Sequence, residues 1–486
     1  MFLLKRLGVL GLVVLFLAIS VPVAADEIDE LRQMLREVIK QNQELTKRVK
    51  VLEERLSRYE KAEELPAPTT SPSEELPWHE RVEMGLSVTT VVQGVTGVDT
   101  TVENLHAHGG REPAGTREAL TDESKGYAAA TVDLDFLASL SQSSRAYLLL
   151  EMGSGHNPED EIPSFAGIID EAISMVPVET HDGEVRISEA WYEQEIPLGA
   201  GKLRFRFGKV DLTTDFDTNE YANDETAQFI SGTFVNNIAV EWPAYGLGMM
   251  AWYETDRLSL GLGYGDADGG WDSIFDYPFL IAEIGLNINP FGRPGHYRFS
   301  VWYNGEKHLR WSQLRAYYAY NVNPQNTDDA WGVALSFDQE ILDSLGVFLR
   351  YGLRDSDHLV GYAGYDENGA FDIESVDFSY GFHHALSLGF QASGKLWGRP
   401  DDALGFGWGF VWLNKNYRDF WKKKGAFASR DGRALETETE YHLEIYYRCQ
   451  VNESLALTPD FQWTINPAGL YDDGFWVLSL RGTWDF

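Results

Sequence analysis

The chain has 486 residues, 75 acidic against 40 basic side chains, a formal net charge of −35 and 44% hydrophobic residues. It is too long for a mini-protein and too apolar for a disordered chain, and its negative field repels phosphate backbones, so no nucleic-acid partner is expected. Its single cysteine, Cys449, excludes a disulfide scaffold and any multi-cysteine metal site, and 46 Gly beside 15 Trp, 23 Tyr and 26 Phe favour an all-β protein.

Residues 1–25 have the pattern of a signal peptide. Lys5 and Arg6 precede an apolar stretch from Leu7 to Ile19, and Val23-Ala24-Ala25 supplies the small residues that a signal peptidase recognises. The apolar stretch is shorter than the roughly 20 residues that a membrane-spanning helix needs. We therefore expect cleavage before Asp26.

Residues 26–64 are predicted to form a short periplasmic α-helical coiled coil. Apolar positions recur at alternating spacings of three and four residues, which is typical of a coiled-coil seam. The seam is Ile28, Leu31, Leu35, Val38, Asn42, Leu45, Val49, Leu52, Leu56 and Tyr59. The segments 48–53 and 55–60 resemble the Arg-h-x-x-h-Glu pattern of short trimeric coiled coils, in which h is an apolar residue. An asparagine within the seam, as at Asn42, is however often found in dimers. We expect a homotrimer.

A Pro-rich linker is predicted at residues 65–78, because four prolines stand there among Ser, Thr and Glu. From residue 79 to residue 486 the period of the apolar pattern changes to two. Apolar side chains then recur at every second position over stretches of roughly ten residues, as expected for tilted strands that cross an outer membrane. Sixteen such stretches are predicted: 84–95, 127–139, 145–153, 186–196, 202–209, 245–253, 257–265, 280–289, 296–304, 330–340, 345–353, 384–393, 403–413, 440–451, 454–464 and 474–485.

The connections between these stretches support a 16-stranded antiparallel transmembrane β-barrel. Short connections follow most even-numbered strands and long ones follow most odd-numbered strands, as in barrels with short periplasmic turns and long outer loops. The last stretch alternates apolar and polar side chains and ends on Phe486, which resembles the signal read by the machinery that inserts outer-membrane barrels. We expect a multi-pass barrel in the outer membrane of a Gram-negative bacterium, in contact with lipid and lipopolysaccharide.

If the apolar face of each strand contacts lipid, the opposite face lines the lumen. This parity predicts inward side chains of both charges together with aromatic rings, a combination that suits a water-filled path for polar solutes. The inward residues that we select are Glu189, Glu193, Arg204, Arg206, Arg298, Trp302, Arg350, Glu444 and Arg448. Barrel interiors also carry such residues only to remain solvated and rigid, so each one alone is weak support for selectivity.

Several motifs from about Glu189 to the C-terminus resemble those of the carbohydrate-selective porin (OprB) family. They include Gly208-Lys209-Val210-Asp211, Trp242-Pro243-Ala244-Tyr245-Gly246, Arg293-Pro294-Gly295-x-Tyr297-Arg298, Phe348-x-Arg350-Tyr351-Gly352 and Thr458-Pro459-Asp460-x-Gln462. The resemblance implies a sixteen-stranded, trimeric outer-membrane channel for sugars. The coiled coil and the linker are additions to the family pattern, and some relatives carry N-terminal modules that touch the cell wall, so a peptidoglycan contact is a further expectation.

The segment 210–244 corresponds to the loop that porins of this architecture fold into the lumen. We expect it to narrow the pore, with polar residues opposite Arg204, Arg206 and Arg350, although the same residues could instead hold the loop in place. The loop residues that we select are Asp215, Asp217, Asn223, Asp224 and Glu225.

No motif predicts an enzyme, a cofactor or a metal site. A Gly-x-Ser-x-Gly elbow, a P-loop and a His-Glu-x-x-His motif are all absent. His383 and His384 are expected to point to opposite faces of one strand, which argues against a shared metal ion. Besides diffusion of sugars, the sequence allows two alternative functions. One is an anion, phosphate or general porin, and the other is a structural tether between outer membrane and cell wall that uses the coiled coil.

Overall fold

The computed structural model describes residues 81–99, 121–156, 185–358, 381–423, 438–469 and 474–486, with Pro158 and Ser164, and without the single positions 268, 270, 272, 321, 326 and 356. The predicted signal peptide, coiled coil and linker lie outside the described residues.

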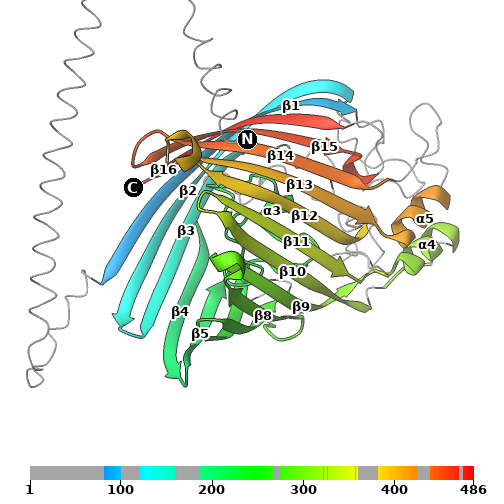
Figure 1. Cartoon of the computed structure of the whole chain (residues 1–486). Coiled ribbons are helices and arrows are strands. Elements are labelled where there is room, and N and C mark those ends of the chain that lie inside the picture. The colour runs from blue at the N-terminus through cyan, green and yellow to red at the C-terminus, as the bar shows by residue number, and fades with distance from the viewer. Residues whose placement is uncertain are drawn as a thin grey trace, which may run out of the picture. The chain divides into compact units, whose positions relative to one another are not determined.

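Sixteen antiparallel strands form a closed barrel (Figure 1). Each strand pairs with the next in sequence, and β16 closes the ring on β1, with Thr90 opposite Gly482. This confirms the predicted fold class, and each predicted stretch overlaps one strand. The strands are β1 Val82–Asp99, β2 Thr121–Ser141, β3 Ser144–His156, β4 Arg186–Leu198, β5 Gly201–Val210, β6 Gly246–Glu254, β7 Leu258–Asp266, β8 Pro278–Ile288, β9 Gly295–His308, β10 Asp328–Leu342, β11 Leu345–Arg354, β12 Phe382–Ser393, β13 Ala403–Leu413, β14 Glu440–Gln450, β15 Leu455–Ile465 and β16 Phe475–Asp485.

The side chains alternate between the two faces of the barrel as the sequence parity requires. On β5, Arg204 and Arg206 are buried while Phe205 and Phe207 are exposed on the outside. Residues of like type therefore form rows across neighbouring strands, and the apolar face points outward around the ring.

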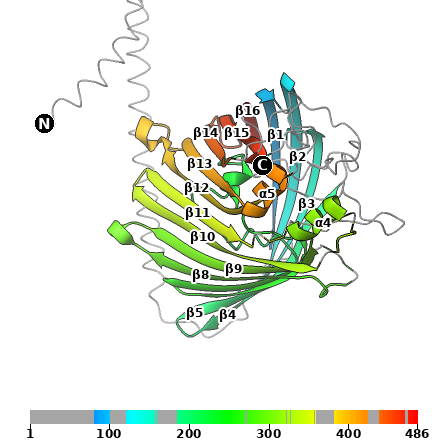
Figure 2. The same cartoon turned by 90° about the vertical axis from the view of Figure 1, so that its right-hand side faces the viewer.

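The connections differ at the two ends of the barrel. One end has short turns, such as 199–200 between β4 and β5 and 343–344 between β10 and β11. The other end carries long loops, and these contain the helices α4 (Trp311–Tyr320) and α5 (Lys415–Lys423). The two helices lie beside each other (Figures 1 and 2), with the rings of Trp311 and Tyr417 5.7 Å apart. None of the helices in the described part of the chain has the length and apolar character needed to cross a bilayer.

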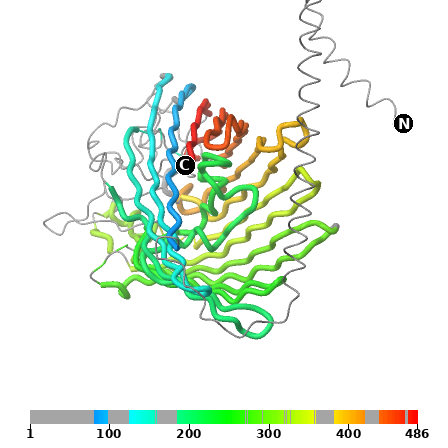
Figure 3. The backbone as a smooth tube through the Cα atoms, turned by 90° about the vertical axis from the view of Figure 1, so that its left-hand side faces the viewer, coloured from blue at the N-terminus to red at the C-terminus, as the bar shows by residue number. Residues whose placement is uncertain are grey.

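The loop between β5 and β6, residues 211–245, is the longest connection that the structure describes in full. We call it the lumen loop. It contains the short helix α3 (Gly232–Val235), and its green trace lies within the ring of strands in Figure 3. Its core side chains Phe216, Phe229 and Phe234 are completely buried. The loop therefore packs as an inner layer against the barrel wall.

One expectation about β12 is wrong. The rings of His383 and His384 stack with their centroids 4.0 Å apart, so the two side chains lie together instead of on opposite faces. The cause is an irregularity in the pairing of β12 with β13, where Phe382 faces Leu413 but His384 already faces Trp412. An extra residue in one strand disturbs the alternation of side chains. No group of three His, Cys, Asp or Glu within the described residues could hold a metal ion.

Candidate pore and its lumen loop

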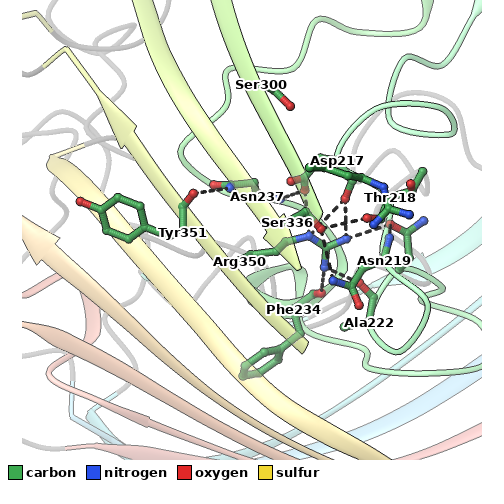
Figure 4. Close-up of polar contacts among 12 residues, drawn as sticks. Asp217, Thr218, Asn219, Ala222, Phe234, Asn237, Ser300, Ser336, Arg350 and Tyr351 are labelled. Carbon is green, nitrogen blue, oxygen red and sulfur yellow. Dashed lines mark hydrogen bonds and ion pairs between the residues drawn. The ribbon is translucent and has the colours of Figure 1, made fainter. Parts of the chain in front are cut away.

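The lumen loop is fastened to β11 by Arg350, which is 1% exposed. Its Nε forms an ion pair with Asp217 Oδ2 at 2.8 Å, and its Nη2 donates to the Asp217 carbonyl and to Asn223 Oδ1, both at 2.8 Å. Nη1 donates to the carbonyls of Phe234, at 2.7 Å, and Ala222 (Figure 4). One guanidinium thus joins three separate stretches of the loop, which a planar group with five donors can do.

Amide and hydroxyl side chains beside this anchor hold the same part of the loop. Asn219 Nδ2 donates to Ser336 Oγ at 3.2 Å, and that hydroxyl donates to the Thr218 carbonyl at 2.8 Å. Asn237 Nδ2 donates to the Tyr351 carbonyl at 3.1 Å (Figure 4). The backbone of Asp217 adopts φ 57°, a left-handed conformation that Asp tolerates better than most residues. The loop is therefore fixed to β10 and β11 through groups that bond mainly to backbone.

A second set of contacts fastens the loop to the opposite wall. Glu444 on β14 is completely buried and accepts from the backbone N–H groups of Ile230, at 2.6 Å, and Ser231, at 3.0 Å. Arg481 on β16 is also completely buried and donates to the carbonyls of Gln228, at 2.8 Å, and Glu225. Since the loop begins at β5 and ends at β6, these contacts show that it crosses the lumen.

Four charged side chains meet where the loop leaves β5: Glu193, Arg204, Arg206 and Asp215. We call them the gate cluster. Asp215 bridges the two arginines, with Oδ1 2.6 Å from Arg204 Nη1 and Oδ2 2.6 Å from Arg206 Nη1. Glu193 on β4 lies 3.3 Å from Arg204 and 2.8 Å from Arg206. Both arginine side chains are nearly buried, so the pairs are formed largely out of water.

Flanking groups complete the surroundings of the gate cluster. Arg145 on β3 pairs with Glu193 at 2.5 Å, and Glu254 on β6 pairs with Arg204 at 3.1 Å. The Arg206 guanidinium also lies 4.0 Å above the ring of Trp191, which stacks on Tyr147. Every charge of the cluster therefore has at least one partner of opposite sign.

A second buried cluster lies at the long-loop end, where the lumen loop returns to β6. Glu241 Oε1 accepts from Arg354 Nη2 at 2.7 Å and lies 3.2 Å from His308 Nε2. The ring of His358 lies 4.9 Å from that of His308. Burial alone raises the pKa of Glu241, but Arg354 and the hydrogen bond from His308 lower it by more, to about 2. Glu241 thus remains a carboxylate and ties the end of the loop to β9 and β11.

Comparisons with known proteins identify the architecture. The family model described as "Carbohydrate-selective porin, OprB family" matches residues 117–486. The chain belongs to the OprB family. This confirms the resemblance in the motifs, and it agrees with an outer-membrane β-barrel. The matched family is one of porins, which are channels and not enzymes.

Individual relatives are distant. A high-pH structure of Pseudomonas putida OprB is similar with a TM-score of 0.64 and 17% identity, covering 84% of this chain and 95% of that one. Pseudomonas aeruginosa OccK11 is similar with a TM-score of 0.39 and 11% identity, covering 84% of this chain and 96% of that one. An uncharacterized protein of Aquifex aeolicus is 26% identical over 185 residues, 37% of this chain. The chain spans about half the length of that curated relative, 49%.

The selected residues fall into two groups in this OprB-family barrel. Glu193, Arg204, Arg206 and Asp215 lie together in the gate cluster, while Arg298 on β9 pairs with Asp338 at 2.8 Å. The others lie at loop anchors or within the wall: Glu189, Asp217, Asn223, Asp224, Glu225, Trp302, Arg350, Glu444 and Arg448.

Several members of the second group use their polar atoms locally. Asp224 Oδ1 accepts from the backbone of Thr226 and Ala227, both at 2.9 Å. Glu189 Oε2 accepts from Trp191 Nε1 at 2.9 Å. Trp302 packs in the buried cluster that includes Phe279. These contacts stabilise the lumen loop and the barrel wall.

Sequence reasoning did not select several polar side chains that complete the anchors, namely Asn219, Asn237 and Glu241. Asn219 stands in a loop with many other polar residues, and nothing in its local pattern separates it from solvated neighbours. Asn219 and Asn237 each contact a strand more than a hundred positions away in the sequence. Two of them had a signal nearby: Asn237 belongs to the pair Asn236-Asn237, which resembles the family pattern, and Glu241 directly precedes the Trp242-Pro243 motif.

Proposed function

We propose that this protein lets carbohydrates or similar small polar solutes diffuse through a water-filled lumen that the lumen loop narrows. The observation that carries the proposal is the gate cluster, in which Asp215 of the loop bridges Arg204 and Arg206 of the wall. Paired guanidinium and carboxylate groups present hydrogen-bond donors and acceptors to a solute while leaving little net charge. That combination suits hydroxyl groups better than ions.

The same pairing argues against an anion or phosphate channel. Such a channel needs cations that are free to attract its solute, whereas Arg204 contacts three carboxylates, those of Glu193, Asp215 and Glu254. Arg298 is likewise paired with Asp338. We infer weak ion selectivity.

We assign the selected residues to two roles. Glu193, Arg204, Arg206, Asp215 and Arg298 line the path that a solute follows. Arg350 and Glu444 instead hold the loop, because they are buried beneath it and their polar atoms bond to it. The remaining selected residues keep the wall and the loop in shape.

The proposal includes placement in the cell. The short turns would face the periplasm and the long loops the exterior, with the apolar outer face against lipid and lipopolysaccharide. Residues 26–64 would form a periplasmic coiled coil that joins three barrels and contacts peptidoglycan, supported by the unbroken heptad pattern. Deleting residues 26–77 should leave single-channel conductance intact and lower the oligomeric state in cross-linking; loss of conductance would contradict this division of roles.

Planar-bilayer recording of the purified protein tests the channel function. We expect weak cation-to-anion discrimination in a KCl gradient and a current that falls as glucose or sucrose is added. Strong anion selectivity without block by sugars would replace the proposal with an anion porin. An absence of conductance would leave only a structural role.

A further inference from the structure

A polar cavity of about 830 Å³ lies on the short-turn side of the gate cluster, between the start of the lumen loop and the inward faces of β5 to β9. Its lining includes the turns at residues 199–200 and 255–256. The hydrogen-bonding side chains in this lining include Thr218, Ser259, Asn287 and His296. The volume falls within the range of roughly 300–1,000 Å³ typical of small-molecule sites.

These four side chains have hydrogen-bonding atoms to spare. Within the described part of the chain, the side chains of Thr218, Ser259 and Asn287 form no hydrogen bond. His296 uses Nδ1 to contact Asp338 Oδ1 at 2.5 Å, which leaves Nε2 for another partner. A cavity with several convergent polar groups of this kind is the usual form of a ligand site.

Strand register brings the groups together. Asn287 on β8 lies directly opposite His296 on β9, and Ser259 on β7 lies opposite Gly285 on β8. A Cβ added at Gly285 would lie 2.2 Å from Ser259 Oγ, so the glycine leaves the space that this hydroxyl occupies. The indole of Trp252, which is 3% exposed, closes the cavity from β6.

The lysine and the arginines that line the cavity are paired with carboxylates. Lys202 pairs with Glu195 at 2.7 Å and with Glu254 at 3.6 Å, while Arg298 pairs with Asp338. Arg204 is shared among three carboxylates, as described above. An anionic solute would therefore compete with existing ion pairs, whereas a neutral polyol needs only the hydroxyl and amide groups and the His296 Nε2.

We propose that this cavity is a binding subsite for a neutral polyhydroxylated solute of mono- or disaccharide size, with Thr218, Ser259, Asn287 and His296 bonding its hydroxyl groups. This inference rests on the proposed function, and it adds a specific site and a preference for uncharged over acidic sugars. The solute would reach the subsite after passing the gate cluster from the long-loop end.

The test compares current block by glucose, sucrose and gluconate in planar bilayers for the wild type and two variants. One variant combines Ser259→Ala with Asn287→Ala, and the other is Thr218→Val, which keeps the shape of the side chain. The matched control combines Thr131→Ala with Ser387→Ala, two inward hydroxyls on β2 and β12 away from the cavity. Heat-modifiable migration in SDS gels shows that each barrel has folded.

For sucrose we expect the dissociation constant from block to rise about tenfold in the double variant and about threefold in Thr218→Val, with no change in the control. In the wild type, glucose should block more strongly than gluconate. Block by sucrose that is equal in the wild type and in both folded variants would overturn the subsite but leave the channel proposal standing. If gluconate blocked more strongly than glucose, the preference for neutral solutes would be wrong. A wild type that no sugar blocks would overturn the carbohydrate channel itself.

Discussion

Replacing Arg350 with Met should release the lumen loop from β11. The substitution leaves the Asp217 carboxylate, which is 1% exposed, without its cation, and it removes the donor from the carbonyls of Ala222 and Phe234. Breaking one side of a buried ion pair typically costs about 3–5 kcal/mol. Since a factor of ten corresponds to about 1.4 kcal/mol, the ratio of released to docked loop should rise roughly a hundredfold to several thousandfold.

Hydrogen exchange across residues 211–245 measures this ratio directly, because backbone amides exchange from the released state. The matched control is Arg293→Met, which removes a partly exposed arginine that pairs with Glu340 at a short turn. A partly exposed pair contributes only about 0–1 kcal/mol, so the control should not change exchange in the loop.

The double variant Asp217→Asn with Arg350→Met should recover part of the protection, because it removes both buried charges together. Single-channel recordings should show larger current noise in Arg350→Met alone. Equal exchange in the wild type and in folded Arg350→Met would refute the view that this guanidinium anchors the loop.

Three further predictions concern the loop. Asp215→Asn leaves both arginines of the gate cluster with fewer carboxylates, so the reversal potential in a KCl gradient should move towards anion selectivity; an unchanged potential would count against a place on the permeation path. Glu444→Gln should speed hydrogen exchange of the two loop amides that donate to this carboxylate, by roughly ten- to a hundredfold. Equal exchange rates in the wild type and the variant would contradict the anchor on β14. Because folding lowers the pKa of Glu241 from 4.5 to about 2, its stabilising contribution of about 3 kcal/mol is complete above pH 4.5 and declines as pH falls towards 2. The temperatures at which SDS resistance is lost in wild type and Glu241→Gln should therefore differ at pH 6 and converge near pH 2.

The barrel could be predicted from the sequence because the alternation of side chains along each strand is a local pattern. A strand with one face in lipid and one in a polar lumen must alternate side chains, and Leu203 to Phe207 does so without interruption. The alternation also placed Arg204 and Arg206 correctly on the buried face. The bulge at His383 shows the limit of this reasoning, since one extra residue changes the parity and leaves no mark in the composition of β12.

The contacts of the lumen loop could not be predicted from the sequence in the same way. The sequence predicted that residues 210–244 face Arg204, Arg206 and Arg350, but it could not say which acid meets which arginine. Asp215 and Asp217 are two residues apart, yet the first pairs with β5 and the second with β11. The left-handed backbone at Asp217 turns the chain between them, and a conformation of that kind depends on long-range contacts.

The net charge of −35 does not predict the electrostatic potential of the lumen, because acidic and basic side chains lie on different strands of the wall. Asp133 on β2 lies opposite Glu151 on β3, so part of the wall is acidic, whereas β5 carries two arginines. The lumen loop brings Asp215 to those arginines and so lowers the positive potential at the gate cluster. We therefore expect ion selectivity to depend on whether the loop is docked. Variants that release the loop from β11 should become more anion-selective as well as noisier, which links the two sets of measurements proposed for Arg350 and Asp215.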